Sequence, residues 1–169
     1  MTQQQTNVTP EMLSHIGRKG KKRVFQVTER DILRYTVSIG DKNPLWRDEA
    51  FAAKGPNKGI VAPPFFLTMI PVEEEDIDDM NEAGLGKSMG LRMEVPTPGF
   101  GGAMATGRDM DFFEPVRPGD TLTMEEELVE VFEKQGRRGP MIFIYSVRTY
   151  TNQHGKVVGL EKTGLIRHK

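Results

Sequence analysis

Apolar residues recur at helical spacing in the first part of the chain. Ile32, Tyr35 and Ile39 stand three or four positions apart, which places them on one face of an amphipathic helix. Thr28 precedes this stretch as a helix N-cap, and Gly40 follows it as a residue suited to end a helix in a left-handed turn. The pattern therefore predicts a helix between these two residues.

Strand spacing takes over at about residue 107. Apolar and turn residues predict strands at residues 108–113, 121–134 and 157–166, a central strand with two apolar faces at 141–151, and a shorter strand at 22–27. Asp48 as a cap and Gly55-Pro56 as a stop predict a short helix at 49–54. Within residues 121–134 the apolar face changes from Leu122, Met124 and Leu128 to Val129 and Val131. Such a change predicts a β-bulge in a long curved strand. The helices come first and the antiparallel sheet after, so the fold class is α+β.

One short run, GIVAPPFFLTMI at residues 59–70, has no polar face. A helix of this composition must be buried on every side, and Pro64 is tolerated in its first turn. We expect the curved sheet to wrap around this helix. The edges of such a sheet stay exposed unless a second copy or a related chain covers them.

The middle of the chain is irregular. Residues 73–79 are acidic, which suits the first turn of an exposed helix, and residues 84–102 hold six glycines and two prolines. We expect a long irregular insertion at about residues 72–102 within one domain that spans residues 1–169.

Composition narrows the function classes. The 169 residues are 37% hydrophobic and 28% charged, as in one globular domain, and no run approaches the roughly 18 apolar residues of a membrane span. The start of the chain lacks the layout of a secretory signal, so we expect a cytoplasmic protein. The net charge of −1 provides no field for nucleic acid, and zero cysteines with only three histidines leave no pattern for a metal site. We expect no metal, no membrane and no nucleic-acid partner.

Three segments occur together in an order and spacing typical of one family: GDKNPLWRDEAFA at 40–52, GIVAPPFFLTMI at 59–70 and DFFEPVRPGDTL at 111–122. From about Gly17 to Arg167 the chain resembles the MaoC-like, hot-dog-fold acyl-thioester dehydratases and R-specific enoyl-CoA hydratases, in particular the fatty-acid-synthase-type dehydratase branch. The resemblance implies a single hot-dog fold, with a curved sheet around a central helix. It also implies a homodimer or heterodimer with another hot-dog chain, and a substrate carried on CoA or acyl carrier protein. It implies no cofactor, and it leaves the acyl group open.

The resemblance assigns a catalytic Asp and, five residues later, a His, which together hold the water that is added or eliminated. A carboxylate beside an imidazole exchanges a proton in either direction. Asp41 matches the Asp, but Trp46 stands at the position of the His, and an indole N–H only donates.

A second departure lies at the start of the apolar run. The family places a His-Gly pair there, and the glycine N–H holds the thioester oxygen in the transition state. The matching residues are Ala62 and Pro63, and proline has no N–H. Loss of one such donor costs about 10²–10³ in rate. Since the family includes degenerate chains that pair with an active sister chain, the resemblance favours a partner subunit.

Other interpretations stay open. The chain can be an active homodimer that uses Asp41 with a helper such as Asp48, a non-enzymatic module that binds acyl thioesters, or a hot-dog thioesterase. Asp41 can equally cap the turn after Gly40, and Asn43 and Asp48 fit turn and cap positions.

Two further groups are candidates for binding. The residues expected to contact substrate are Asn43, Trp46, Ile60, Val61, Ala62, Pro63, Phe65 and Phe66; packing in the core explains the aromatic ones equally well. The basic cluster Arg18, Lys19, Lys21, Lys22 and Arg23 is either a solvated face or a contact for CoA phosphates or an acidic carrier.

Overall fold

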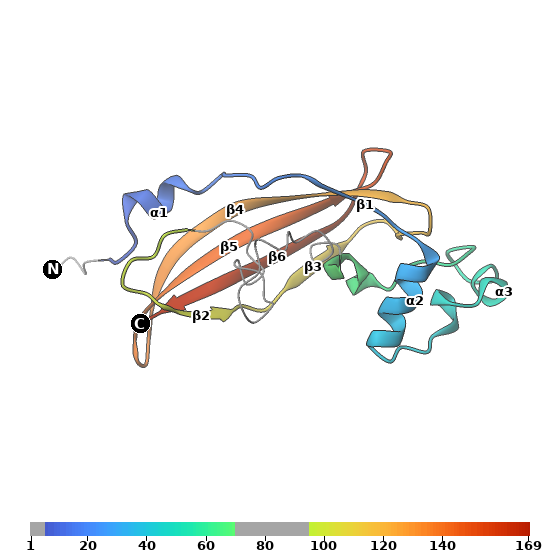
Figure 1. Cartoon of the computed structure of the whole chain (residues 1–169), viewed down its shortest axis with the longest axis horizontal. Coiled ribbons are helices and arrows are strands. Elements are labelled where there is room, and N and C mark those ends of the chain that lie inside the picture. Colours follow the sequence, from blue (N-terminus) through green and yellow to red (C-terminus); the bar gives the residue numbers. More distant parts are fainter. Residues whose placement is uncertain (1–5, 70–94) are drawn as a thin grey trace.

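A curled antiparallel sheet forms the body of the computed structural model, which describes residues 6–69 and 95–169. Its strands follow the order β1-β4-β5-β6-β2, and β3 also pairs with β6. The strands are β1 (Arg23–Gln26), β2 (Gly102–Ala105), β3 (Asp109–Phe112), β4 (Thr121–Gly136), β5 (Gly139–Thr151) and β6 (Val157–His168). The three long strands β4, β5 and β6 form the centre of the sheet (Figure 1), and the short strands lie at its edges.

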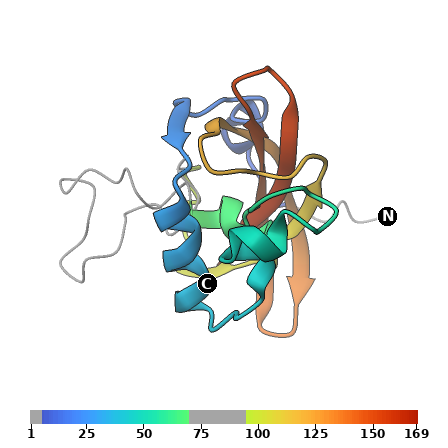
Figure 2. The same cartoon turned by 90° about the vertical axis from the view of Figure 1, so that its right-hand side faces the viewer.

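Short helices lie at the two ends of this sheet. They are α1 (Pro10–Ser14), α2 (Glu29–Ser38), η1 (Pro44–Trp46), α3 (Glu49–Ala52) and η2 (Pro64–Met69), of which η1 and η2 are 3₁₀-helices. In Figure 1, α1 lies on the left, near the N-terminus, and α2 and α3 lie at the right-hand end of the sheet. Figure 2 looks onto the end that carries α2, α3 and η2.

Local sequence explains α2 well. The Thr28 side chain accepts a hydrogen bond from the Asp31 backbone N–H at 3.2 Å, and the Asp31 carboxylate accepts one from the Thr28 N–H at 3.1 Å. This reciprocal capping box fixes the start of the helix. Gly40 has a φ of 70°, the left-handed conformation that glycine adopts at least cost. The predicted helix and its ending are confirmed.

Two apolar clusters fill the inner face of the sheet. The first joins α2 and η2 to β4 and β5 near one end, with Ile32, Phe66 and Leu122 at its centre. The second lies toward the other end, where Met12 of α1 and Val95 pack with Leu128 and other strand residues. A band of buried polar side chains separates the clusters: Glu126, Ser146, Arg148, Glu161 and Thr163.

The predicted strands and bulge are confirmed, and the structure sets their limits. The register between β4 and β5 shifts at Leu128/Glu130, where the sequence predicts a bulge. Helix α3 ends at Ala52 rather than at residue 54. The sequence predicts neither β2 nor α1: β2 begins at Gly102, inside the glycine-rich stretch that predicts a loop, and the five residues of α1 show no clear apolar face.

The prediction of a helix buried on every side is wrong. Residues Pro64–Met69 form a 3₁₀-helix, and only one side of it is buried: Phe66 is 1% exposed and Phe65 is 50% exposed. Two consecutive prolines at its start remove backbone donors and favour a short, tight helix.

The expected insertion at about residues 72–102 lies mostly outside the described residues. Its described part, residues 95–101, is not a loose loop, because Val95 and Phe100 are buried in the second cluster. The acidic run at residues 73–79 also lies outside the described residues.

Candidate functional site

The loop after α2 holds Asp41 in a fixed setting. The Asp41 N–H donates to the Thr36 carbonyl at 2.9 Å. The indole Nε1 of Trp46 donates to Asp41 Oδ2 at 2.8 Å, and the Asn43 backbone N–H donates to Oδ1 at 2.9 Å. Both carboxylate oxygens thus accept from N–H groups of the same loop. In this arrangement Asp41 organises the loop and has no imidazole beside it.

The neighbouring polar residues cap short helices. Asn43 Oδ1 accepts from the Leu45 N–H at 3.1 Å at the start of η1. Asp48 Oδ1 accepts from the Phe51 N–H at 3.0 Å at the start of α3. The interpretation of both residues as turn and cap residues is confirmed.

A pocket of about 240 Å³ opens beside this loop. Five of the predicted substrate-contacting residues line it: Trp46, Val61, Ala62, Pro63 and Phe66. The sequence prediction missed the other wall, which Phe112, Phe113, Glu114, Pro115 and Val116 form after β3. These residues belong to the third family segment, DFFEPVRPGDTL, so that motif contained the missing signal.

The remaining predicted residues do not line this pocket. Ile60 packs against the first apolar cluster. The ring of Phe65 lies edge-on to Phe112 at 5.8 Å between centroids. Neither Asp41 nor Asn43 lines the pocket. Asp41 is linked to the pocket by its hydrogen bond with Trp46, which does line it.

Ala62 and Pro63, at the positions of the family's His-Gly pair, have no free backbone donor. The Ala62 N–H donates to the Val116 carbonyl at 2.8 Å, and Pro63 has no N–H. Neither residue of the pair that matches the family's His-Gly therefore offers an N–H to a thioester oxygen.

Polar groups are few at the pocket. Asn57 and Glu114 contribute to its lining. The Asn57 carbonyl accepts from Arg117 Nη2 at 2.6 Å, which ties the loop before the apolar run to the β3–β4 connection. Glu114 pairs with Lys156 at 3.1 Å. The pocket thus has mostly apolar walls and two polar side chains, a composition usual for small-molecule sites.

The basic cluster lies elsewhere. Lys19 Nζ pairs with Glu125 at 2.8 Å and with Glu127 at 3.7 Å, and Lys22 pairs with Glu125 at 3.7 Å. The hydrogen bond from Lys19 lowers the pKa of the Glu125 carboxyl. None of the five basic residues lines the pocket, and the lysines that pair here are partly neutralised by glutamates of β4.

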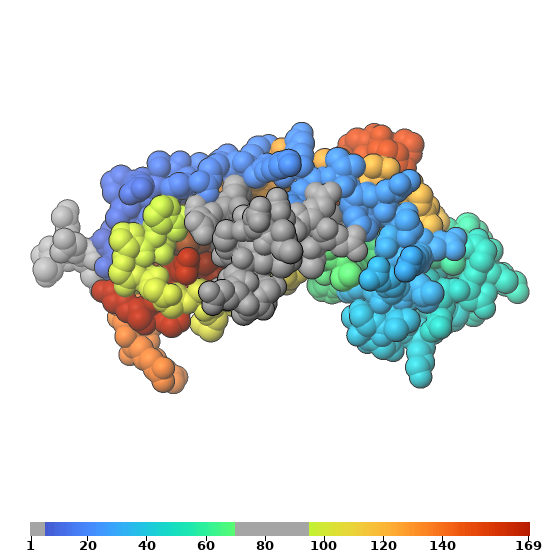
Figure 3. Space-filling model, viewed as in Figure 1, coloured from blue at the N-terminus to red at the C-terminus, as the bar shows by residue number. Residues whose placement is uncertain are grey.

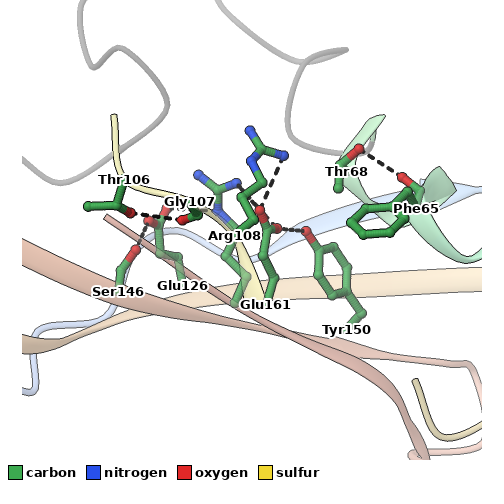
Figure 4. A network of polar contacts seen from close by, with 10 residues as sticks. Phe65, Thr68, Thr106, Gly107, Arg108, Glu126, Ser146, Tyr150 and Glu161 are labelled. Atoms are coloured by element: carbon green, nitrogen blue, oxygen red, sulfur yellow. Dashed lines mark hydrogen bonds and ion pairs between the residues drawn. The ribbon is translucent and has the colours of Figure 1, made fainter. Parts of the chain in front are cut away.

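A second polar assembly, missed from the sequence, crosses the inner face of the sheet (Figure 4). Glu126 and Arg148 are register partners on β4 and β5, and Arg148 and Glu161 are partners on β5 and β6. Arg148 lies 3.6 Å from Glu126 and 3.4 Å from Glu161. The Tyr150 hydroxyl donates to Glu161 at 2.6 Å, and the Ser146 hydroxyl donates to Glu126 at 2.5 Å.

Arg108 connects this assembly to the surface. It is half exposed and lies 3.2 Å from Glu161. The connection from β2 to β3 contains one residue more than the part of β6 opposite it. Ala105 pairs with Leu165 and Asp109 pairs with Lys162, so residues 106–108 face only residues 163–164. This extra residue forms a bulge that turns Arg108 inward.

Burial and charge shift the ionisation of this assembly. Burial opposes the charged form of Arg148, but the carboxylates of Glu126 and Glu161 outweigh it and raise its pKa. Burial, together with the negative charge of Glu161, raises the pKa of the Tyr150 hydroxyl. At neutral pH Tyr150 is therefore a hydrogen-bond donor.

Within residues 6–69 and 95–169, no three His, Asp or Glu side chains converge as a metal site requires. The same part of the chain contains no helix that is both long enough and apolar enough to cross a membrane.

Comparisons with known proteins identify the family and the fold. Residues 14–161 match the model of the FAS1-like, dehydratase domain region. A probable enoyl-CoA hydratase alpha subunit of Thermomonospora curvata is 26% identical over 139 residues, which cover 82% of this chain and 44% of that protein. The chain thus spans less than half the length of that relative.

Solved structures share the fold. A chain of the ChsH1-ChsH2 complex from Mycobacterium tuberculosis superposes with a TM-score of 0.72 at 24% identity, covering 94% of this chain and 95% of that one. The R-hydratase PhaJ1 from Pseudomonas aeruginosa gives a TM-score of 0.62 at 23% identity, covering 91% and 82%. The family match over residues 14–161 shows that the chain belongs to the FAS1-like dehydratase family, and its curled sheet has the hot-dog fold of MaoC-like dehydratases and R-hydratases.

Proposed function

We propose that this chain is a catalytically degenerate subunit of an R-specific 2-enoyl-thioester hydratase or 3-hydroxyacyl-thioester dehydratase. It shapes an acyl-binding pocket, and a sister hot-dog chain supplies the acid-base residues. The substrate would be an acyl group on CoA or on acyl carrier protein, and the reaction would need no metal and no redox cofactor.

The hydrogen bond from Trp46 to Asp41 carries the proposal. Addition of water to a double bond needs a group that takes a proton from the water and one that returns a proton to carbon. Asp41 accepts two N–H donors through its two oxygens, and its partner at the histidine position is an indole that cannot act as a base. The loop therefore holds the carboxylate but provides no partner for proton exchange.

The pocket wall supports the same conclusion. Enolate-like transition states need preorganised donors at the thioester oxygen. The Ala62 N–H is committed to Val116, and Pro63 has none. A partner chain must therefore supply this stabilisation as well.

The sheet provides an edge for such a partner. Strands β2 and β3 pair only with β6, so their other sides lie open among the described strands. Large apolar side chains lie exposed beside this edge, among them Met104, Phe112 and Phe113. An open apolar strand edge favours pairing with another sheet. Phe112 and Phe113 also line the pocket, so a chain docked here would complete the pocket wall.

The test is an assay of the hydration of a medium-chain trans-2-enoyl-CoA, in which the loss of enoyl absorbance measures the rate. We expect no turnover by the purified chain alone, and turnover after it is mixed with a sister chain that carries both the Asp and the His. Asp41→Asn in this chain should leave the rate of the mixture unchanged, whereas the same change in the sister chain should abolish it.

Turnover by the isolated chain at an ordinary enzymic rate, lost on Asp41→Asn, would contradict the proposal and identify Asp41 as the base.

One observation favours a second function, that of a non-enzymatic binding module: the pocket keeps its apolar walls although the catalytic pair is missing. Tight binding of acyl-CoA without turnover in any pairing would identify that function.

A further inference from the structure

The outer face of the sheet carries a row of stacked aromatic side chains near the β4–β5 hairpin. The rings of Phe132 and Phe143 lie parallel, with 1° between their planes and 5.1 Å between centroids. Tyr145 continues the row, at 6.5 Å from Phe143 and 17° between planes. These three positions alternate with buried neighbours and are only partly buried themselves, so they form an apolar surface on the face opposite the core.

A glycine on the neighbouring strand makes room for this row. Gly164 of β6 is the register partner of Tyr145. A Cβ atom at Gly164 would lie 2.7 Å from Tyr145 Cδ1 and 2.6 Å from the Ile144 carbonyl oxygen, which is closer than side-chain atoms approach. The tyrosine ring thus occupies the space that a side chain on β6 would fill.

Positive charges surround the aromatic row. Lys134 Nζ lies 5.1 Å from the centroid of the Phe132 ring and 5.3 Å from that of Phe143. Lys162 Nζ lies 4.8 Å from the Tyr145 ring. Arg137 and Arg138 are exposed at the tip of the hairpin, which projects from the body as the orange segment in Figures 1 and 3.

The nearby carboxylates already have partners. Glu130 pairs with Lys162 at 3.1 Å. Glu133 accepts hydrogen bonds from Thr6 and Asn7 at the other face of the strand. Among residues 6–69 and 95–169, no carboxylate pairs with Lys134, Arg137 or Arg138. Within this described part of the chain, the three cations have no carboxylate partner and lie beside a partly exposed apolar row.

We propose that this surface, made by Phe132, Lys134, Arg137, Arg138, Phe143 and Tyr145, docks an acidic protein segment that also presents aliphatic side chains. Carboxylates of the segment would pair with the hairpin cations, and its aliphatic side chains would cover the rings. Nucleic acid fits less well, because the ring faces lie against one another and under Lys134 rather than open to bases. A membrane fits less well, because the tip residues QGRRG carry no apolar side chain to insert.

This docking surface is distant from the pocket along the sheet. Strand β4 begins beside the pocket end and reaches the hairpin after 16 residues, a path of about 50 Å at about 3.3 Å per residue. Trp46, the only tryptophan in the chain, lines the pocket. Its fluorescence therefore reports on the pocket and not on the docking surface.

The probe is a short fluorescein-labelled helical peptide of glutamate and leucine, with a lysine-and-leucine peptide of the same pattern as its counterpart. Fluorescence anisotropy at physiological salt should show binding of the acidic peptide and none of the basic one. Arg137→Glu with Arg138→Glu should weaken binding by about tenfold or more, and so should Lys134→Glu. Phe143→Ala should weaken it as well, with circular dichroism confirming the fold. The matched control, Lys42→Glu with Lys54→Glu, makes the same charge change on exposed residues near the pocket and should leave the affinity unchanged.

Three results would overturn the proposal. Equal weakening by the Lys42/Lys54 control would show attraction by total charge alone. A shift in Trp46 emission on addition of the peptide would show binding at the pocket. Tighter binding of single-stranded oligothymidine or of phosphatidylglycerol vesicles than of the acidic peptide, with loss in the Arg137/Arg138 variant, would assign the surface to a different class of partner.

Discussion

Trp46 and Asp41 are joined by one hydrogen bond within the loop after α2. The indole Nε1 donates to the carboxylate at 2.8 Å. The indole also packs against the first apolar cluster and lines the pocket. The sequence alone favours a packing role for Trp46. In the structure Trp46 packs, forms a hydrogen bond and lines the pocket.

Removal of that hydrogen bond should cost stability. Trp46→Phe keeps an aromatic ring but removes the Nε1 donor, so we expect the free energy of unfolding to fall by about 1–3 kcal/mol. Urea denaturation followed by circular dichroism measures the change. In an Asp41→Ala background the same substitution should cost much less, because the acceptor is already absent. Equal costs in both backgrounds would assign the effect to packing.

The buried charges on the inner face predict a larger effect. Glu161→Ala leaves Arg148 without one of its two carboxylates in a site that is 0–1% exposed, and breaking a buried pair in this way costs about 3–5 kcal/mol. Glu127→Ala is the control, since the Glu127 side chain is 43% exposed and its pair with Lys19 is long at 3.7 Å. That change should cost less than about 1 kcal/mol. Similar costs for the two variants would contradict a role of the network in stability.

Tyr150 predicts an alkaline effect. Its pKa is raised in the folded chain, chiefly by burial, whereas an unfolded tyrosine titrates near pH 10. Above about pH 10 the unfolded state therefore binds fewer protons than the folded state, and stability falls as the pH rises. Thermal melts from pH 8 to 11 should show a shallower decline for Tyr150→Phe than for the wild type. Tyr145→Phe, on the outer face, should follow the wild type.

Among the elements, η2 offers the sharpest contrast between neighbours. Phe66→Ala removes a ring that is 1% exposed and contacts Tyr35 at 5.9 Å between centroids, so it should cost about 3–5 kcal/mol. Phe65→Ala removes a ring that is 50% exposed and should cost less than about 1 kcal/mol. Chemical denaturation of both variants checks this. Equal costs would show that both sides of η2 are buried, as the apolar run alone predicts.

Elements with a clear period or cap could be predicted from the sequence, whereas contacts between distant segments could not. Helix α2 has caps and a face, and β4 has a bulge that its change of apolar face reveals. The buried network depends on three strands that meet at Glu126, Arg148 and Glu161, which no local period encodes. One signal existed: Glu126 falls between Met124 and Leu128 on the apolar side of the alternation.

The candidate site was predicted in part for the same reason. The 59–66 segment is continuous in sequence, so Val61, Ala62, Pro63 and Phe66 could be named together. The opposite wall comes from residues 112–116, about fifty positions later in the chain, and only the fold places it there. The exposure of Phe65 likewise depends on which side of η2 faces the sheet, and an all-apolar run does not encode that side.

At the scale of the whole molecule, the open β2–β3 edge predicts association. Met104→Lys places a charge on an apolar edge residue that is 51% exposed and should weaken self-association or pairing with a sister chain without unfolding the chain. Val24→Lys is the control, because Val24 is 57% exposed on β1 at the opposite edge of the sheet. Sedimentation velocity over a range of concentrations measures both variants. Weaker association in the Val24 variant would place the interface at the β1 edge instead.

The division of the inner face into two apolar clusters also bears on how such a chain can change over evolutionary time. Substitutions in separate packing units have nearly independent effects, whereas neighbours within one unit must change together. The unit beside the pocket includes Phe66, Leu67 and Val116, and the unit around Leu128 and Ile142 lies beyond the band of charges. Residues around the pocket can therefore be exchanged while the far half of the sheet keeps its packing, so the shape of the pocket can change without loss of the fold.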